Sequence, residues 1–280
     1  MTTPSVKMTY EEFQLLNEFI SDLIGVSFPA ERGRLLESRL RPRVQALHLP
    51  SFMDYYFVLQ CNIDDEAEHL MHAVTNNETY FFRETRQFEA LFDEVIGDLK
   101  AEAVTPGTIR LLCAGCSSGE EPYTIRMFGE ENPNPDGESM LQIDAIDIDL
   151  ERLEAGRTGE YGPNSLRTTS ETQIQSYFSR SGSNRFKLLP HLQVGVRFSY
   201  GNILDVDTYP SRVSYDAVFC RNVLIYFSEP ALHRALDSFA SALRPGGLLF
   251  LGHSESIIGV SPHFEPIRLR KCIAYRKTGE

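Results

Sequence analysis

The sequence predicts an α/β protein: a doubly wound, mostly parallel sheet with a small N-terminal all-helical domain and an inserted small β subdomain. Three observations support this fold class. From residue 108 onward, apolar runs that end in polar or glycine turns alternate with helical segments, as expected for a parallel sheet covered by helices. Residues 8–75 show helical spacing without strand-like alternation. A stretch rich in Ser, Thr, Gly and Asn interrupts the alternation at about 157–195.

The N-terminal region predicts short amphipathic helices. A polar and then aromatic segment, TNNETYFFRE at residues 75–84, is expected to be a connector, and a further helix follows it. We therefore predict a helical domain with its connector over residues 1–88 and a second domain over residues 89–280. The apolar residues that recur at helical spacing are Phe13, Leu16, Phe19, Ile20 and Leu23, then Leu35, Leu36, Leu40, Val44 and Leu47.

The second domain contains five candidate strands. In doubly wound folds, ligands bind outside the carboxyl ends of the strands, near the point where the strand order reverses. Residues that directly follow the strands are therefore the candidates for a functional site. The candidate strands are residues 109–114, 141–146, 196–200, 217–220 and 248–251.

Composition excludes several classes of protein. With 42% hydrophobic and 24% charged residues, the chain is expected to fold as a soluble globular protein. No stretch approaches the roughly 20 apolar residues of a membrane span, so we expect a cytoplasmic protein without membrane insertion. A net charge of -12 disfavours nucleic acid as a partner. Five scattered cysteines favour reduced thiols over a disulfide framework.

A glycine-containing turn, CAGCSSGEEPYT, follows the first strand. Gly115 and Gly119 permit a tight turn and close backbone approach before a helix begins. The turn has neither the GK[ST] ending of a P-loop nor the GxGxxG spacing. Glu120 and Glu121 stand at the helix start, where they would repel a pyrophosphate and suit a cationic ligand. The alternative is that they are capping acids beside a structural turn.

The second strand ends in AIDID, which places Asp147 at its tip and Asp149 just beyond it. An acid at this position is placed to accept hydrogen bonds from both ribose hydroxyls of an adenosine. Asp147 is the better candidate for that role, whereas Asp149 is expected to cap the next helix. Taken alone, either residue is explained as well by capping as by ligand binding.

Polar residues also follow the third and fourth strands. Asn202, in the turn YGNI, carries an amide suited to an adenine edge. The string YDAVFCRNVLIYF puts Arg221 and Asn222 at the tip of the fourth strand. The string LRPGGLLFLGHSES predicts a helix end, a glycine turn and the fifth strand. His253 in that string is better explained as a satisfied polar residue than as a base.

Together these segments resemble a class I methyltransferase, which is a Rossmann-like fold. The strings TNNETYFFRE, CAGCSSGEEPYT, AIDID and FCRNVLIYF resemble the chemotaxis receptor glutamate methyltransferase family (CheR-type) over nearly the whole chain. The resemblance implies an S-adenosyl-L-methionine-dependent protein-glutamate O-methyltransferase, whose product is S-adenosyl-L-homocysteine. It would form glutamyl methyl esters on the cytoplasmic helices of methyl-accepting chemoreceptors, for adaptation in bacterial signalling.

The same resemblance implies a set of cofactor-binding residues drawn from the connector and from the strand tips. No metal site is expected, because Cys113 and Cys116 have no second cysteine pair and no nearby histidine in sequence. The residues expected to bind the cofactor are Asn77, Thr79, Arg83, Glu120, Asp147, Asn202, Ile203, Arg221 and Asn222.

Formation of a glutamyl ester is expected to need no general base. A glutamate carboxylate has a pKa near 4.3 and is already ionised at neutral pH. The enzyme must hold it in line with the sulfonium methyl group, about 3–3.5 Å away, and remove its water. Arg83 and Tyr226 are the candidates for orienting the substrate carboxylate, Arg83 through its charged guanidinium and Tyr226 through its hydroxyl. A structural salt bridge and a core tyrosine explain these two residues equally well.

An arginine-rich segment of the helical domain is a candidate docking surface. Arg32, Arg39 and Arg43 fall near one helical face and would dock on an acidic chemoreceptor helix. The alternative is a solvated face, or pairing within the chain with Glu31 and Glu37.

The inserted segment bears on how a receptor is recognised. In the family a small β subdomain stands here, and in some members it binds a peptide at the receptor C-terminus by adding a strand. This chain has a short turn around residues 181–184, where the tethering type carries a longer glycine-containing loop. We therefore expect an enzyme that acts without a C-terminal pentapeptide tether. We also expect a monomer. The alternative is that the edge binds a related peptide with other side-chain preferences.

Three rival functions are weighed against this one. An NAD-dependent oxidoreductase is disfavoured by the acidic pair after the glycine turn and by the missing GxGxxG. A non-catalytic signalling adaptor that retains the fold is disfavoured by the intact set of cofactor residues. A methyltransferase for small molecules or nucleic acid is the third, and the acidity of the chain counts against nucleic acid only.

Overall fold

The computed structural model describes residues 6–103, 105, 107–133, 141–210 and 214–279. The chain forms two compact units. The helical unit comprises Met1–Asn76 and Tyr226–Leu232, and the sheet unit comprises Asn77–Ile225 and His233–Glu280. The division falls earlier than the expected boundary near residue 88, because Phe81 and Phe88 of the connector region are buried in the core of the sheet unit.

The helical unit is built from short helices, as the apolar spacing predicted. The first, α1 (Tyr10–Ile24), begins with a capping box between Thr9 and Glu12 and ends at Gly25, which is left-handed with φ 87°. The others are α2 (Gly33–Ala46), α3 (Phe52–Cys61) and α4 (Ile63–Val74), with a 3₁₀ turn at Ala30–Arg32. Fully buried side chains from all four helices form the core: Leu16, Ile20, Leu36, Leu40, Tyr55 and Leu70.

The sheet unit contains a seven-stranded sheet with the order β6-β2-β1-β7-β8-β10-β9. The strands from β6 to β8 pair in parallel, whereas β10 runs antiparallel to both β8 and β9. The predicted mostly parallel sheet is confirmed, and the antiparallel pair at its edge is an addition. The strands are β1 (Ile109–Ala114), β2 (Leu141–Asp147), β6 (Val196–Tyr200), β7 (Tyr215–Cys220), β8 (Leu243–Leu251), β9 (Phe264–Arg268) and β10 (Ile273–Lys277).

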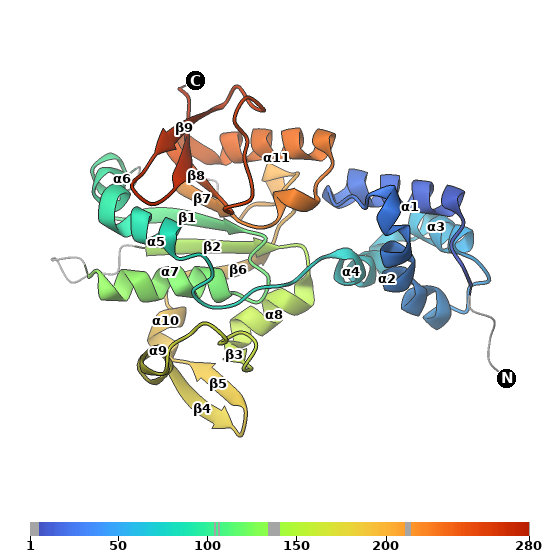
Figure 1. Cartoon of the computed structure of the whole chain (residues 1–280), viewed down its shortest axis with the longest axis horizontal. Coiled ribbons are helices and arrows are strands. Elements are labelled where there is room, and N and C mark those ends of the chain that lie inside the picture. Colours follow the sequence, from blue (N-terminus) through green and yellow to red (C-terminus); the bar gives the residue numbers. More distant parts are fainter. Residues whose placement is uncertain (1–5, 104, 106, 134–140, 211–213, 280) are drawn as a thin grey trace. The chain divides into compact units, whose positions relative to one another are not determined.

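The strand order reverses at β1. The chain runs from β1 outward to β2 and β6, and returns to β7 and β8 on the other side of β1. Figure 1 shows the crossover helices α7 (Glu120–Glu131) and α11 (Glu229–Ala242) on opposite sides of the sheet, as right-handed crossovers in opposite directions require. A third helix, α8 (Leu150–Thr158), packs on β2 and β6. The carboxyl ends of β1, β2, β6 and β7 therefore lie at one edge, around the switch point where such folds bind ligands.

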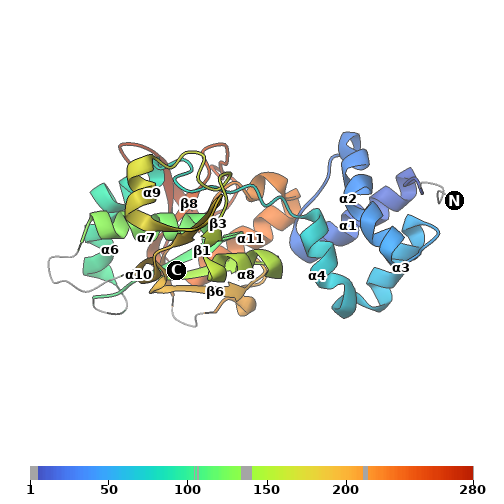
Figure 2. The same cartoon turned by 90° about the horizontal axis from the view of Figure 1, so that it is seen from below.

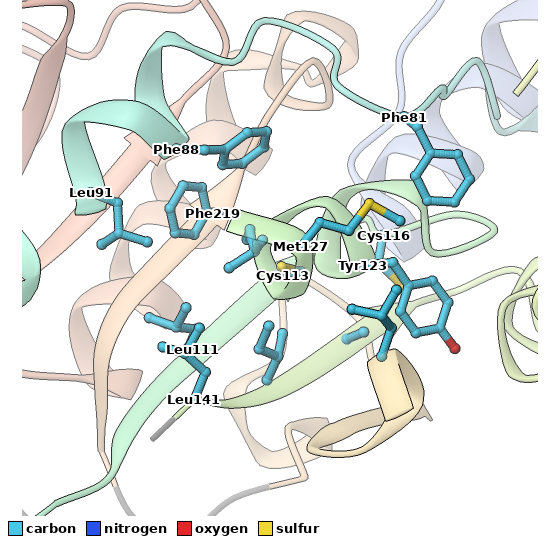
Figure 3. Close-up of a cluster of buried hydrophobic side chains, with 14 of the residues drawn as sticks. Phe81, Phe88, Leu91, Leu111, Cys113, Cys116, Tyr123, Met127, Leu141 and Phe219 are labelled. Atoms are coloured by element: carbon cyan, nitrogen blue, oxygen red, sulfur yellow. The ribbon is translucent and has the colours of Figure 1, made fainter. Parts of the chain in front are cut away.

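A helical segment before β1 covers part of the sheet. It consists of α5 (Arg86–Ala90), a π-helical turn (Leu91–Val95) and α6 (Ile96–Glu102). Phe88 from this segment packs near Phe219 of β7, with ring centroids 5.7 Å apart (Figure 3). These aromatic contacts attach the segment, and the connector that precedes it, to the middle of the sheet.

The inserted β subdomain is a separate three-stranded antiparallel sheet with the order β3-β5-β4 (Figures 1 and 2). A two-residue connection, Ser183 and Asn184, joins β4 to β5. This agrees with the short turn predicted at residues 181–184. Its elements are β3 (Glu160–Tyr161), α9 (Glu171–Tyr177), β4 (Phe178–Gly182), β5 (Arg185–Leu188) and α10 (Pro190–Gln193).

Two further observations concern the described residues. None of their helices is both long enough and apolar enough to cross a membrane. They also hold no group of three or more His, Cys, Asp or Glu side chains arranged for a metal ion. Cys113 and Cys116 are buried free thiols, and burial raises the pKa of each well above its usual value. Both side chains therefore act as small core residues.

Candidate active site

Three residues of the turn between β1 and α7 have a positive φ. Gly115 and Gly119 have φ of 75° and 89°, and Ser117 has φ of 48°. A Cβ at Gly115 would lie 2.6 Å from Val223 Cγ2, and one at Gly119 would lie 2.7 Å from Phe198 Cζ. Glycine is therefore required at both positions, and Ser117 holds a conformation that is uncommon outside functional turns.

Asp147 lies at the tip of β2, beside this turn. Its buried carboxylate accepts hydrogen bonds from the backbone N–H groups of Ser117, at 2.7 Å, and Asp149, at 2.9 Å. Burial raises the pKa of Asp147 to about 6, because the desolvation of the charged form outweighs these hydrogen bonds. Within the described residues, Ser117 Oγ is buried without a hydrogen-bond partner. A ligand carrying hydroxyl groups would satisfy Ser117 Oγ and favour the ionised form of Asp147.

Glu120 is buried in the first turn of α7. Its Oε2 accepts a hydrogen bond from Ser118 Oγ at 2.8 Å, and the Ser118 carbonyl accepts from the Tyr161 hydroxyl at 2.8 Å. Burial raises the pKa of Glu120, and hydrogen bonds from Ser118 and Ser165 only partly oppose the rise. Two buried carboxyl groups with raised pKa values, Glu120 and Asp147, flank one turn. A cationic ligand would stabilise their ionised forms.

The connector reaches the tip of β2 through Asn77. Asn77 Nδ2 donates to Asp149 Oδ2 at 2.8 Å. The other oxygen of Asp149 accepts from the Arg152 N–H and caps α8, which confirms the capping role predicted for Asp149. Thr79 lies half-buried two positions farther along the connector. The connector is therefore fastened to the same strand tip that carries Asp147.

Asn202 and Ile203 form the turn after β6. Asn202 Oδ1 accepts from the Leu204 N–H at 3.0 Å, so the side-chain oxygen is used to hold the turn. The N–H of Gly201 donates to the carbonyl oxygen of Asp147 at 3.1 Å, and Ile203 is buried. The turn after β6 is thereby brought beside Asp147, as the parallel pairing of β2 and β6 requires.

Arg221, at the tip of β7, has 2% of its side chain exposed. Its Nε is buried without a hydrogen-bond partner among the described residues, whereas its other nitrogens are bonded by the protein. Its guanidinium donates to Glu121 Oε2 at 3.0 Å and to the carbonyl oxygens of Arg83, at 2.7 Å, and Glu84, at 3.2 Å. It also lies 4.6 Å from the centroid of the Phe88 ring. These contacts fasten the connector to α7. They give Arg221 a positioning role, and its direct contact with the cofactor stays a prediction.

Asn222 follows with a positive φ of 60°. Its backbone N–H donates to Glu255 Oε2 at 2.7 Å, and its Nδ2 donates to Glu84 Oε1 at 3.4 Å. Glu84 also has a positive φ, 51°, and accepts from the His253 N–H at 3.2 Å. Two residues in uncommon backbone conformations, from distant parts of the chain, therefore contact each other at this edge.

The two residues expected to orient the substrate belong to different units. Arg83 donates to the Glu78 carbonyl at 2.7 Å and lies 5.5 Å from the Tyr80 ring centroid. In the helical unit, the Tyr226 hydroxyl accepts from Asn76 Nδ2. Each residue has contacts within its own unit, and their joint action on a substrate stays a prediction.

The three docking candidates differ in their surroundings. Arg43 forms a bidentate pair with Glu66 of α4, at 2.6 Å and 2.7 Å, and Arg39 donates to two carbonyl oxygens at the C-terminus of α4. Arg32 is exposed. The alternative of contacts within the chain therefore holds for Arg39 and Arg43, although Glu37 pairs with Arg41 rather than with either of them.

Three residues that shape the site were not among the candidates: Ser117, Glu84 and Glu255. Each lies inside one of the strings quoted from the sequence. The Glu that ends TNNETYFFRE and the Glu of GHSES were the available signals. A one-dimensional pattern does not show which of these side chains turns toward the strand tips.

The arrangement fits S-adenosyl-L-methionine. Asp147 offers a carboxylate for ribose hydroxyls, Glu120 offers buried negative charge for a cation, and the turn at Gly115 and Gly119 admits a close approach. The fold and this site together define a class I S-adenosylmethionine-dependent methyltransferase.

Comparison with known families agrees with this class. Residues 77–273 match the CheR methyltransferase SAM binding domain, and residues 11–75 match the CheR methyltransferase all-alpha domain. The chain belongs to the CheR methyltransferase family, which confirms the resemblance inferred from its motifs and the expected cofactor.

The relatives that it matches span nearly the whole chain. It is 33% identical to chemotaxis protein methyltransferase 2 of Vibrio cholerae serotype O1 over 274 residues, covering 97% of this chain and 94% of that protein. It is 32% identical to chemotaxis protein methyltransferase 1 of Pseudomonas aeruginosa, covering 95% and 97%. Among solved structures, PKMT2 from Rickettsia typhi in complex with AdoHcy is 19% identical, with a TM-score of 0.36 over 63% of this chain and 26% of that chain. A likeness of that size adds nothing to the assignment.

Proposed function

We propose that this protein forms glutamyl methyl esters on the cytoplasmic helices of methyl-accepting chemoreceptors and serves adaptation in chemotaxis. The observation that carries the proposal is the buried pair of carboxyl groups, Asp147 and Glu120, at the glycine turn of a CheR-family chain. The chemotaxis methyltransferases to which the chain is similar support the pathway. Such a reaction belongs to the cytoplasm.

The proposed reaction needs binding and orientation more than proton transfer. Bound S-adenosyl-L-methionine supplies an electrophilic methyl group. The acceptor carboxylate, with an ordinary pKa near 4.3, is ionised at neutral pH and needs no base. Asp147 and Glu120 would hold the cofactor, while Arg83 and Tyr226 would orient the acceptor carboxylate through charge and a hydroxyl. Arg221 would fix the backbone that carries Arg83, because it donates directly to the Arg83 carbonyl.

Receptor docking is proposed to involve the exposed start of the arginine-rich segment. Arg32 and Arg34 are exposed there and would meet acidic side chains of a receptor helix. Arg39 and Arg43 would contribute by holding α2 against α4. We further propose that the enzyme acts as a monomer. We also propose that it acts without a C-terminal peptide tether, because only two residues connect β4 to β5.

Methylation of purified receptor fragments with tritiated cofactor tests the proposal. A glutamyl methyl ester releases methanol in alkali, whereas N-methyl groups do not. We expect alkali-labile label on the receptor fragment. Alkali-stable label would contradict ester formation, and absence of label despite cofactor binding would favour the non-catalytic adaptor.

A further inference from the structure

The segment between β3 and α9, residues 162–170, fastens the inserted subdomain to the connector. The Phe81 N–H donates to the Ser165 carbonyl at 2.9 Å, and the Phe81 carbonyl accepts from Thr168 Oγ1 at 2.7 Å. Both polar backbone groups of Phe81 are therefore satisfied by this one segment. Arg167 lies between the two residues that satisfy them, so its backbone is fixed beside the connector.

The Arg167 side chain contacts the side chains of two connector residues. Its Nη2 donates to Glu78 Oε1 at 3.0 Å, and its Cζ lies 3.7 Å from the centroid of the Tyr80 ring. Its Nη1 donates to the Asn164 carbonyl at 2.9 Å, which holds the guanidinium in this orientation. Although 38% of its side chain is exposed, Arg167 thus has an ion pair, a cation–π contact and a backbone contact.

Arg83 contacts the same glutamate through a different group. Arg83 Nη1 donates to the backbone carbonyl oxygen of Glu78 at 2.7 Å. Among the residues that the structure describes, Arg83 forms no ion pair with a carboxylate. Glu84 and Glu121 interact with its charge, but their carboxylates accept hydrogen bonds from other residues. The Arg83 guanidinium therefore keeps donors for a carboxylate from outside the chain.

The carboxylate of Glu78 is an internal competitor for these donors. The Glu78 side chain is 64% exposed, and the backbone of the same residue already contacts Arg83. Without Arg167, a change of rotamer would bring the carboxylate to the Arg83 guanidinium, where an ion pair would form. Arg167 prevents this pairing because it binds the carboxylate itself.

We propose that Arg167 is a positioning residue, which binds the Glu78 carboxylate and thereby keeps the Arg83 guanidinium available for the carboxylate of the substrate. The inserted subdomain thus contributes to the active site without contacting the substrate. The role of Arg83 toward the substrate rests on the proposed function, whereas the competition between Arg167 and Arg83 for Glu78 rests on the contacts of these three residues.

Methylation of a receptor fragment at saturating cofactor tests the proposal with two substitutions, alone and combined. Arg167→Ala frees Glu78 to act as an internal competitive inhibitor. KM for the fragment should then rise about twofold to sixfold at unchanged kcat, the range for a surface ion pair that must first be broken. Glu78→Gln removes the competing charge, so it should methylate as wild type does, and the double variant should regain its KM. The matched control Arg185→Ala, at an exposed position of β5, should leave KM unchanged.

Recovery in the double variant distinguishes this role from two others. If Arg167 contacted the substrate directly, or only stabilised the fold, the double variant would stay as impaired as Arg167→Ala, and that result would overturn the proposal. A wild-type KM in Arg167→Ala would also overturn it when Arg83→Ala is impaired. An unimpaired Arg83→Ala would contradict the role of Arg83 in the proposed function.

A second measurement needs no methyl transfer. The side-chain Nε–Hε resonance of Arg83, assigned by its loss in Arg83→Lys, reports whether a carboxylate binds the guanidinium. This NMR resonance should shift in Arg167→Ala and return to its wild-type position in the double variant with Glu78→Gln. An unshifted resonance in Arg167→Ala, or a shift that Glu78→Gln does not reverse, would overturn the competition for Glu78 whatever the methylation rates.

Discussion

Arg221 and Glu121 form an ion pair across the tip of β7 and the first turn of α7, with Nη1 and Oε2 3.0 Å apart and 2% and 16% of the two side chains exposed. Burial raises the pKa of Glu121, and the Arg221 charge opposes that rise. Nη2 of the guanidinium donates to the connector, at the carbonyl oxygens of Arg83 and Glu84. One side chain therefore joins three segments that lie far apart in the sequence.

We expect strong coupling between Arg221 and Glu121. Arg221→Lys removes the planar guanidinium and its connector contacts, and Glu121→Gln leaves the buried guanidinium without the nearer of its two counterions, Glu84 being the other. The two substitutions should be non-additive by about 1–3 kcal/mol in urea unfolding. The same pair of variants should weaken cofactor binding, since the connector carries Asn77 and Thr79. Additive free energies of unfolding would show that the pair does not act as a unit.

Asp147→Ala should weaken S-adenosyl-L-methionine binding by about 1–3 kcal/mol, because ribose hydroxyls would lose a charged acceptor. Isothermal titration calorimetry measures this directly. Glu171→Gln, at an exposed position of α9, serves as the control and should bind the cofactor as wild type does. An unchanged affinity of Asp147→Ala for S-adenosyl-L-methionine would show that the Asp147 carboxylate does not bind the cofactor.

The pH dependence of cofactor binding should report the raised pKa of Asp147, about 6 against an ordinary value of 3.8. The folded state holds this proton more tightly than the unfolded state does, so the group stabilises the free protein as pH falls from about 7 toward 5. That contribution is lost as pH rises through about 6. Cofactor binding, which uses the ionised form, should weaken over the same fall in pH.

Asp147→Asn tests whether the carboxyl group of Asp147 causes this pH dependence of cofactor binding. Thermal unfolding is measured with and without cofactor across pH 5–8. The cofactor-induced shift in Tm should depend less steeply on pH in Asp147→Asn than in wild type. Glu120, whose pKa is also raised by burial, should retain part of the slope. A slope equal to that of wild type would mean that another group titrates.

Substitutions at Arg43 and Arg32 should distinguish a role in the stability of the helical unit from a role in receptor docking. Arg43→Ala strands Glu66, whose side chain is 4% exposed, and should cost about 3 kcal/mol in unfolding free energy. Arg32→Ala lies at an exposed position and should change stability by less than about 0.5 kcal/mol. If Arg32 docks the receptor, its loss should raise KM and reduce the salt dependence of methylation. Receptor kinetics equal to those of wild type would indicate that Arg32 lies on a solvated face and does not dock the receptor.

Peptides from receptor C-termini should show no saturable binding at micromolar concentrations. The reason is the two-residue connection between β4 and β5, which changes the edge offered to an added strand. Fluorescence anisotropy of labelled peptides measures this. A clear isotherm would show that the edge of β4 accepts a peptide despite the short turn.

The sequence by itself determined the helical N-terminal unit, the five parallel strands of the sheet and the family, but not the antiparallel pair β9 and β10. Alternating apolar runs and glycine turns specify a parallel sheet, because strand and helix periods are local properties of the chain. The strings around Gly115, Asp147 and Asn222 were recognisable for the same reason, since each places its residues at the tip of one strand. Capping by Asp149 followed from its position before a helical run.

Only the tertiary structure decided what the charged side chains touch. Arg221 meets a carbonyl 138 positions away, and Arg43 finds Glu66 on another helix, 23 positions along the chain. Gln87 is likewise oriented by Leu251, 164 positions away. A long side chain samples many rotamers, and its choice depends on which donors and acceptors the fold brings within about 3 Å. That information is carried by packing between distant segments, so no local pattern contains it.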